Sequence, residues 1–190
     1  YIQNLNGLMW NKDGGQWPHV CEAMDSIQAD ISCFSELNVD TNNYDVRRKM
    51  ESICQRQFTH NKLILSASKY KSPTLYKPGG TAILIRNQMT ASIKSHTRDR
   101  MGRWTSVGIH TNYRKIRVIS AYQVCQSRRN QGTTTIASQQ IAQIIEDSAA
   151  TNVYQRLNPR ESFINDLMSF IRHAQSENEE IIVAGDFNDD

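Results

Sequence analysis

The chain of 190 residues suits one domain with enough polypeptide to bury a sizeable core. Its formal net charge is only +3, which argues against a large polyanion-binding surface and favours local basic clusters along a groove. No apolar run is long enough to predict a membrane span or a signal peptide. The cysteines form no CxxC pair and have no histidine at zinc-finger spacing, so we expect free thiols in a reducing compartment at Cys21, Cys33, Cys54 and Cys125.

Short strands and amphipathic helices alternate in the first half of the chain. The helices are predicted from apolar residues spaced three or four apart, and the strands from short β-branched runs. We expect, in order, a strand ending near Asn4, a helix over Trp17–Ile27, a strand over Asp30–Ser35, a helix over Asn43–Gln57 and a strand over Leu63–Leu65. Such a strand–helix–strand opening is typical of folds that gather functional residues at the carboxyl ends of strands.

The second half of the chain begins with strands and continues with helices. The predicted strands are Thr81–Ile85, Ser92–His96, Arg103–His110 and Lys115–Ala121, of which the last two form a hairpin. They are followed by an amphipathic segment over Thr135–Asp147, a helix with Asn158 as its N-cap and Pro159 in its first turn, and a buried strand over Ile181–Val183. A hairpin beside the opening unit predicts mixed sheets in an α/β (α+β) fold, with residues 1–190 forming one domain.

Polar residues stand at the ends of four predicted strands, where apolar ones would pack better. They are Asn4, Glu36, Tyr122, and Asp186 with Asn188. On an extended strand end, Asp186 and Asn188 would project to one side and Phe187 would point into packing on the other. A carboxylate and an amide that project together suit the rim of an active site, because one accepts a proton and the other donates to an anion.

Each of these residues also has an ordinary structural explanation. Asn4 suits a turn, Glu36 suits the start of a solvated loop, and Tyr122 suits a half-buried aromatic ring with a wet hydroxyl. The end of the chain suits a solvated acidic turn. Its spacing also matches an EF-hand loop, although a strand rather than a helix precedes the matching residues Asp186, Asn188 and Asp190.

Five ordered motifs resemble those of the endonuclease/exonuclease/phosphatase family, whose fold is deoxyribonuclease-I-like. They are Asn4-Leu5-Asn6-Gly7-Leu8, Phe34-Ser35-Glu36, Pro78-Gly79-Gly80-Thr81-Ala82-Ile83, Val118-Ile119-Ser120-Ala121-Tyr122 and Gly185-Asp186-Phe187-Asn188. Ser35 departs from the pattern, because the family usually has Gln before this Glu. The resemblance implies a four-layer α-β-β-α sandwich of two mixed sheets with its C-terminal part missing, in a fragment cut at both ends.

The resemblance also implies a role for each polar strand end. Glu36 would hold Mg²⁺ (or Mn²⁺), which neutralises the charge that phosphodiester hydrolysis places on the phosphate. Asp186 would orient or deprotonate the attacking water, and the Tyr122 hydroxyl would contact the scissile phosphate. Asn4 and Asn188 would donate hydrogen bonds to the phosphate or help to place the water.

Further contacts with the substrate are expected from the first motif and from basic loops. Asn4 and Asn6 are expected to bind the phosphate. A basic loop covers Lys69–Lys77, and further expected phosphate contacts are Arg103, Arg128 and Arg129. Arg103-Trp104 suits a phosphate contact beside a stacking ring, although it suits a surface arginine beside a core tryptophan better.

The motifs are most similar to those of retroelement-type and apurinic-type endonucleases. This similarity implies a Mg²⁺-dependent phosphodiesterase that nicks DNA in an intracellular, nuclear setting, with a reverse transcriptase as a possible fusion partner. Two alternatives stay open: a phosphatase or phosphodiesterase of inositol phosphates or sphingolipids on the same fold, and a decayed DNA-binding module without catalysis. Salt separates the first alternative from the nuclease, because DNA binding weakens steeply as salt rises.

Two features depart from the family pattern. Residues 126–162 form a longer stretch than compact members have at this place, and we interpret them as a lineage-specific insertion. The family's closing Ser-or-Thr/Asp/His motif does not occur, and none of the five histidines has the required context. Loss of a general acid–base group costs about 10²–10⁴ in rate. We therefore expect residues 1–190 to be nearly inactive and the intact parent protein to be an active nuclease.

Overall fold

The computed structural model describes residues 1–71, 74–125, 135–151 and 158–189. Its helices are α1 (Trp17–Ile27), α2 (Tyr44–Gln57), α3 (Ile136–Thr151) and α4 (Pro159–Ser176), with a 3₁₀ turn η1 over Asn87–Ser92. Within these ranges, none of the helices combines the length and the apolar character that crossing a bilayer requires.

The first sheet has the strand order β1-β2-β4-β3. Its strands are β1 (Ile2–Asn4), β2 (Ile31–Ser35), β3 (Asn61–Ser66) and β4 (Thr81–Arg86). β1 and β2 run parallel, whereas β4 lies antiparallel to both of its neighbours. The parallel pair exists because α1 carries the chain back to the start of the sheet between the two strands.

The second sheet has the order β5-β6-β7-β8. Its strands are β5 (Ile93–Arg98), β6 (Trp104–His110), β7 (Lys115–Tyr122) and β8 (Glu180–Asp186). The first three form an antiparallel meander, and β8 joins β7 in parallel. The mixed sheets predicted from the sequence are therefore confirmed, and the strand boundaries agree within a few residues.

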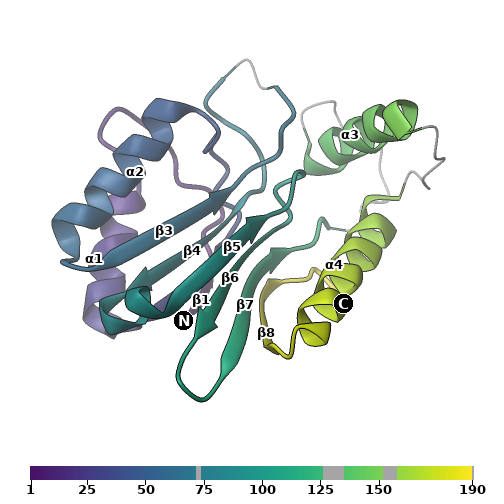
Figure 1. Ribbon diagram of the computed structural model, residues 1–190. Coiled ribbons are helices and arrows are strands. Elements are labelled where there is room, and N and C mark those ends of the chain that lie inside the picture. The colour runs from purple at the N-terminus through teal and green to yellow at the C-terminus, as the bar shows by residue number, and fades with distance from the viewer. Residues whose placement is uncertain (72–73, 126–134, 152–157, 190) are drawn as a thin grey trace.

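The two sheets pack face to face, with α1 and α2 on the outer face of the first and α4 on the outer face of the second (Figure 1). This arrangement confirms the predicted four-layer α-β-β-α sandwich. Strand β4 shows why the first sheet is apolar on both faces. Ala82 and Leu84 pack under the helices, whereas Ile83 and Ile85 pack between the sheets.

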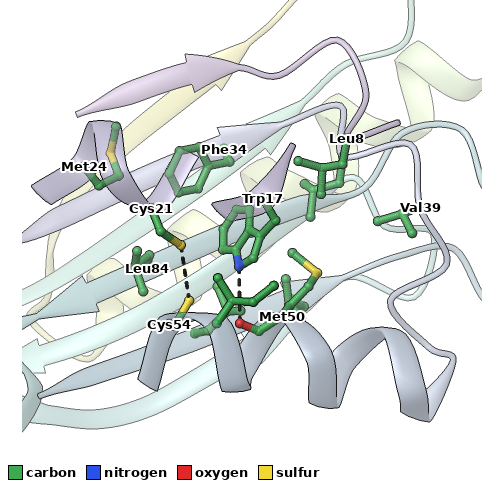
Figure 2. Packing of buried hydrophobic residues seen from close by; sticks show 14 of the residues in the cluster. Leu8, Trp17, Cys21, Met24, Phe34, Val39, Met50, Cys54 and Leu84 are labelled. Atoms are coloured by element: carbon green, nitrogen blue, oxygen red, sulfur yellow. Dashed lines mark hydrogen bonds between the residues drawn. The ribbon is translucent and has the colours of Figure 1, made fainter. Parts of the chain in front are cut away.

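Trp17 is the centre of the core beneath α1 and α2 (Figure 2). Its ring meets Phe34 of β2 edge to face at 5.6 Å, and its indole N–H donates to the Met50 carbonyl at 3.2 Å. One side chain thus joins α1 to β2 and to α2. Cys21 and Cys54 lie beside it with their sulfur atoms 3.9 Å apart. All four cysteines are free as expected, with Cys33 also buried and Cys125 exposed.

Hydroxyl groups connect the two sheets at their shared face. Ser120 of β7 donates to the Phe34 carbonyl of β2 at 3.0 Å. The hydroxyls of Thr81 and Thr105 are 2.8 Å apart, which joins β4 to β6. Buried polar groups that satisfy one another in this way fix the register of one sheet on the other.

Strand β8 corrects one expectation. Its apolar residues were expected to be buried, but Ile182 is 51% exposed and Val183 is 37% exposed. The reason is position, because β8 is the outermost strand of its sheet in the described part of the chain. An apolar run alone does not distinguish an edge strand from a central one. The predicted insertion over residues 126–162 contains α3 and the start of α4, and the rest of it lies outside the described residues.

Candidate active site

The strand ends bearing polar residues meet at one edge of the sandwich. In the first sheet Asn4 pairs in register with Ser35, which places Glu36 one residue beyond it. In the second sheet Tyr122 pairs in register with Asp186. Both pairs are parallel, so their carboxyl ends point the same way, and Asn4 Nδ2 donates across the two sheets to Asp186 Oδ2 at 2.7 Å.

The Asp186 carboxylate is held through both of its oxygens. Oδ2 accepts from Asn4, and Oδ1 accepts from the Asn188 backbone N–H at 3.1 Å. Asn4 is fixed in turn, because its Oδ1 accepts from the Asn6 backbone N–H at 2.8 Å. The orientation of this carboxylate is therefore set before any substrate binds, as expected for a group that must direct a proton or a water molecule.

Tyr122 connects the Asp186 carboxylate with that of Glu36. Burial raises the pKa of Tyr122 far above its usual range, and a hydrogen bond with Glu36, followed by electrostatic interactions with Glu36, Cys125 and Asp186, raises it further. The phenol is only 3% exposed and stays protonated, so it is a hydrogen-bond donor. Glu36 itself is half-buried.

Three of the eight non-glycine residues with positive φ in the described part of the chain lie at the same place. Asn6, Glu36 and Asn188 have φ values of +48°, +52° and +48°, in the left-handed region that non-glycine residues seldom adopt. Such conformations persist only where the surroundings impose them, and they gather at functional sites. Gly185 serves another purpose, because a Cβ there would lie 1.9 Å from the Ala121 carbonyl oxygen of β7.

Asn188 differs from the sequence-based expectation. Because β8 ends at Asp186 and Asn188 is left-handed, the two side chains do not continue an extended strand. The Asn188 amide instead donates to the Gln123 carbonyl at 2.6 Å, and its oxygen accepts from the Cys125 thiol at 3.0 Å. The packing predicted for Phe187 is confirmed, since its ring centroid lies 6.2 Å from that of Phe163 on α4.

Arg103 is a correction. It was expected to contact substrate phosphate, but it is 3% exposed and its guanidinium is bound to Asp99 at 2.8 and 3.0 Å and to Asp166 at 2.8 Å. Its neighbour Trp104 is 6% exposed and belongs to the core, so it offers no stacking surface. From the sequence, Arg103 is a basic residue beside a predicted strand. That pattern does not reveal that Asp99 and Asp166 neutralise its charge.

The other expected substrate contacts have different outcomes. Asn6 is exposed beside Asn4, where a phosphate could reach it. Lys77 of the basic loop is buried and paired with Asp40 at 3.0 Å, so it is a structural residue. The expected contacts Arg128 and Arg129 lie outside the described residues.

Sequence reasoning missed the residue that supports the Asn188 segment. Arg160, in the first turn of α4, donates to the carbonyls of Val124 at 2.8 Å and Asn188 at 3.2 Å, and it pairs with Asp189. It thereby holds the two chain segments that follow Tyr122 and Asp186. Its position after the Asn158-Pro159 cap gave no signal of this contact.

The donor set at this edge fits a hard divalent cation. Among the residues that the structure describes, no three His, Cys, Asp or Glu side chains gather closely enough to bind a metal alone. Mg²⁺ needs fewer protein ligands, because it keeps several waters and takes one or two carboxylates. The Glu36 and Asp186 carboxylates both act on Tyr122, and they supply the oxygen ligands that Mg²⁺ prefers. Glu36 and Asp186 would therefore hold the ion.

Comparisons with known proteins agree with this fold. A 3′–5′ exonuclease (NExo) from Neisseria meningitidis gives a TM-score of 0.56 at 15% identity, with 98% of this chain and 56% of that chain covered. TDP2 from Caenorhabditis elegans gives a TM-score of 0.52 at 15% identity, with 93% of this chain and 43% of that chain covered. A humanised TDP2 from D. rerio gives a TM-score of 0.56 at 14% identity, with 100% of this chain and 65% of that chain covered. The chain thus spans about half the length of these solved structures. A comparison with curated proteins gave no match.

A family model provides the assignment. The model of the endonuclease/exonuclease/phosphatase family matches residues 4–190, a range that includes every strand end described above. The chain therefore belongs to the endonuclease/exonuclease/phosphatase family.

Proposed function

We propose that this chain carries the catalytic residues of a divalent-metal-dependent phosphodiesterase that nicks DNA. One observation carries the proposal: the hydrogen bond between Asn4 and Asp186 joins the ends of the two sheets, with Tyr122 and Glu36 beside it. Four polar groups from four strands share one edge although no core packing requires them there.

Each side chain has a definite part in phosphodiester hydrolysis. Asp186 accepts a proton from the attacking water, and the hydrogen bonds from Asn4 and from the Asn188 backbone keep its oxygens oriented. The protonated Tyr122 hydroxyl donates to a phosphate oxygen as negative charge develops there. Glu36 and Asp186 would hold Mg²⁺ (or Mn²⁺), which would supply positive charge for the phosphate and the leaving oxygen.

DNA is the substrate we favour over a small phosphoester. Lys12, Lys69 and Lys71 are exposed near the first sheet's loops, which suits a backbone with several phosphates. One solved relative, the NExo 3′ phosphatase of Neisseria, was determined with a product DNA hairpin. The Asn-Leu-Asn-Gly opening favours a retroelement-type nickase, and with it a nuclear location and a fused reverse transcriptase.

The test is nicking of supercoiled plasmid by the full-length protein with Mg²⁺. Asp186→Asn should lower the nicking rate by about 10²–10⁴-fold, because the proton acceptor is lost. Glu36→Gln should lower it comparably and raise the Mg²⁺ concentration needed. The matched control is Glu180→Gln, which removes an exposed acid at the end of β8 opposite Asp186 and should leave the nicking rate unchanged.

Two other outcomes would each contradict the proposal. Turnover of an inositol phosphate or sphingolipid in place of DNA, with weak salt dependence, would indicate a small-molecule phosphoesterase. DNA binding that Asp186→Ala leaves untouched, together with no nicking by the unmodified protein, would indicate a binding module without catalysis.

A further inference from the structure

Two adjoining hollows open on the surface next to the candidate active site. The first has a volume of about 480 Å³ and is lined by Asn6, Trp10, Leu75 and Tyr76 among others. The second, of about 450 Å³, shares Trp10 and Leu75 with the first and continues to Lys12 and Lys49. Both volumes fall in the range typical of small-ligand sites.

The first hollow is continuous with the catalytic strand ends. Its residue Asn6 donates its backbone N–H to the Asn4 side chain, which in turn contacts Asp186. Its residue Gly7 donates to the Glu36 carbonyl at 2.8 Å, so the floor of the hollow is bonded to the segment that carries Glu36. A ligand in this hollow would therefore lie next to a group held at the active site.

The first hollow is apolar and aromatic, and its apolar side chains are exposed. Met9 is 76% exposed, Tyr76 is 58% exposed and Leu75 is 46% exposed. Trp10, by contrast, is half-buried and packs against the core beneath α1 and α2, so its ring is held in place. A fixed indole among exposed apolar side chains is the arrangement that stacks a planar base.

Charge changes from the first hollow to the second. Lys12 and Lys49 line the second hollow, and Asp45 lines it too, which leaves an excess of one positive charge. A nucleotide chain presents the same alternation, because each apolar base is followed by a phosphate. Amide groups of Asn6 and Asn38 also line the first hollow and can meet the polar edge of a base.

We propose that these hollows bind the nucleotide next to the scissile phosphate. Its base lies on Trp10 in the first hollow, and its following phosphate lies near Lys12 and Lys49 in the second. The inference rests on the proposed function for the position of the scissile phosphate, and it adds a base-binding subsite that requires an unpaired or unstacked nucleotide.

The direct test is tryptophan fluorescence, because the chain has three tryptophans and the other two, Trp17 and Trp104, are 0% and 6% exposed. The full-length protein carrying Asp186→Ala is titrated with a thymidine trinucleotide, because this variant should not cleave the trinucleotide during the titration. Saturable quenching is expected. A trinucleotide lacking the base at the subsite position should bind about 5- to 150-fold more weakly, the range for one stacked base.

Variants at Trp10 separate stacking from simple stability. The affinity of variants that lack Trp10 is measured by isothermal titration calorimetry, which needs no tryptophan. Trp10→Phe keeps a ring, so it should keep the affinity and lose the quenching. Trp10→Leu should bind all the trinucleotides equally weakly, because no ring remains to distinguish a base from its absence. Lys12→Gln with Lys49→Gln should weaken every trinucleotide by the same factor, and more so at low salt. Thermal unfolding of each variant confirms that it is folded.

The control is Tyr113→Leu, which removes an aromatic ring that is 95% exposed on the β6–β7 hairpin, at the opposite end of β7 from Tyr122. It should change neither the quenching nor the difference in affinity between the trinucleotides with and without the base. Quenching by inorganic phosphate alone, or an equal penalty for the missing base in Trp10→Leu and the unmodified protein, would overturn the subsite. Nicking of plasmid in the same preparation reports on the proposed function separately, so either can fail without the other.

Discussion

Arg103 holds three segments of the second half of the molecule together. Its guanidinium binds Asp99 in the preceding turn and contacts Asp166 and Ser162 on α4. Burial alone would lower the pKa of Arg103, but hydrogen bonds and charge from Asp99, followed by Asp166, raise it above its usual value. The charged arginine thus has a structural role, and its Cζ also lies 4.8 Å from the centroid of the Trp104 ring.

Replacing Arg103 should be costly for stability. Arg103→Met leaves Asp99, whose side chain is 7% exposed, without its partner, and breaking a buried pair in this way costs about 3–5 kcal/mol. Urea unfolding measures the loss. Adding Asp99→Asn should recover part of it, because the uncompensated charge is removed.

A surface pair provides the comparison for Arg103. Arg114 and Glu180 are 66% and 59% exposed, so Arg114→Met should change the free energy of unfolding by no more than about 1 kcal/mol. Equal losses for Arg103→Met and Arg114→Met would show that the buried network has no special role.

Among the elements, α4 is the helix that carries the aromatic packing of the second sheet. Phe163 and Phe170 on this helix contact Trp104 of β6, and Arg160 in its first turn holds the segments around the candidate site. The start of the helix is fixed by Asn158, whose side chain accepts from the backbone N–H groups of Arg160 at 3.1 Å and Glu161 at 3.4 Å.

Removing this cap should weaken the whole domain slightly. Asn158→Ala should lower the free energy of unfolding by about 1 kcal/mol, because two backbone donors lose their acceptor, and Asn158→Asp should retain stability. Thermal or urea unfolding measures both. Asn165→Ala is the matched control, since this exposed asparagine lies inside the same helix and alanine is the better helix former there. A loss from Asn165→Ala as large as that from Asn158→Ala would contradict the capping argument.

Sequence patterns among neighbouring residues predicted the helices and strands well, but they predicted poorly which side chains are exposed or paired. The spacing of apolar residues identifies α2, and the same spacing with the cap at Asn158 identifies α4, because capping and periodicity are properties of neighbouring residues. The exposure of Ile182 depends on which strand lies at the edge, and the second ion pair of Arg103, beyond the nearby Asp99, depends on an acid 63 positions away. Neither fact is encoded near the residue it concerns.

The candidate site was predictable for a reason that belongs to topology. Parallel strands place their carboxyl ends at one edge, so polar residues there must meet once β1 pairs with β2 and β7 with β8. The sequence could not specify that Asn188 adopts φ +48° and turns its amide toward Gln123, because this depends on Arg160 and Cys125. The positions of the site residues followed from the strand order, whereas the orientations of their side chains followed from tertiary contacts.

At the scale of the whole molecule, the two sheets meet through hydroxyl contacts in the interior and through the Asn4–Asp186 hydrogen bond at the edge that carries the candidate site. Glu36 comes from the first sheet and Asp186 from the second. Both carboxylates act on Tyr122, so a cation at this edge would meet two acidic groups, one from each sheet. A metal at this edge would bridge the two halves of the sandwich and stabilise the folded chain.

Mg²⁺ should therefore raise the unfolding temperature without any substrate. At a concentration of 100 times Kd, binding to the folded state alone adds about 2.7 kcal/mol, and each kcal/mol corresponds to about 2–4 °C in a domain of this size. EDTA should reverse the shift. Glu36→Gln and Asp186→Asn should each remove most of it, whereas Glu180→Gln, at the far end of β8, should keep it.

The sign of the effect without metal distinguishes this explanation from simple loss of structure. Glu36→Gln removes one of two negative charges that act on the same buried phenol, so in EDTA the variant should unfold at a temperature no lower than the unmodified protein. A variant that is destabilised in EDTA and still gains the full shift with Mg²⁺ would show that Glu36 supports the fold and that the ion binds elsewhere. Stability in EDTA together with loss of the shift is the combination that assigns the ion to the edge where the two sheets meet.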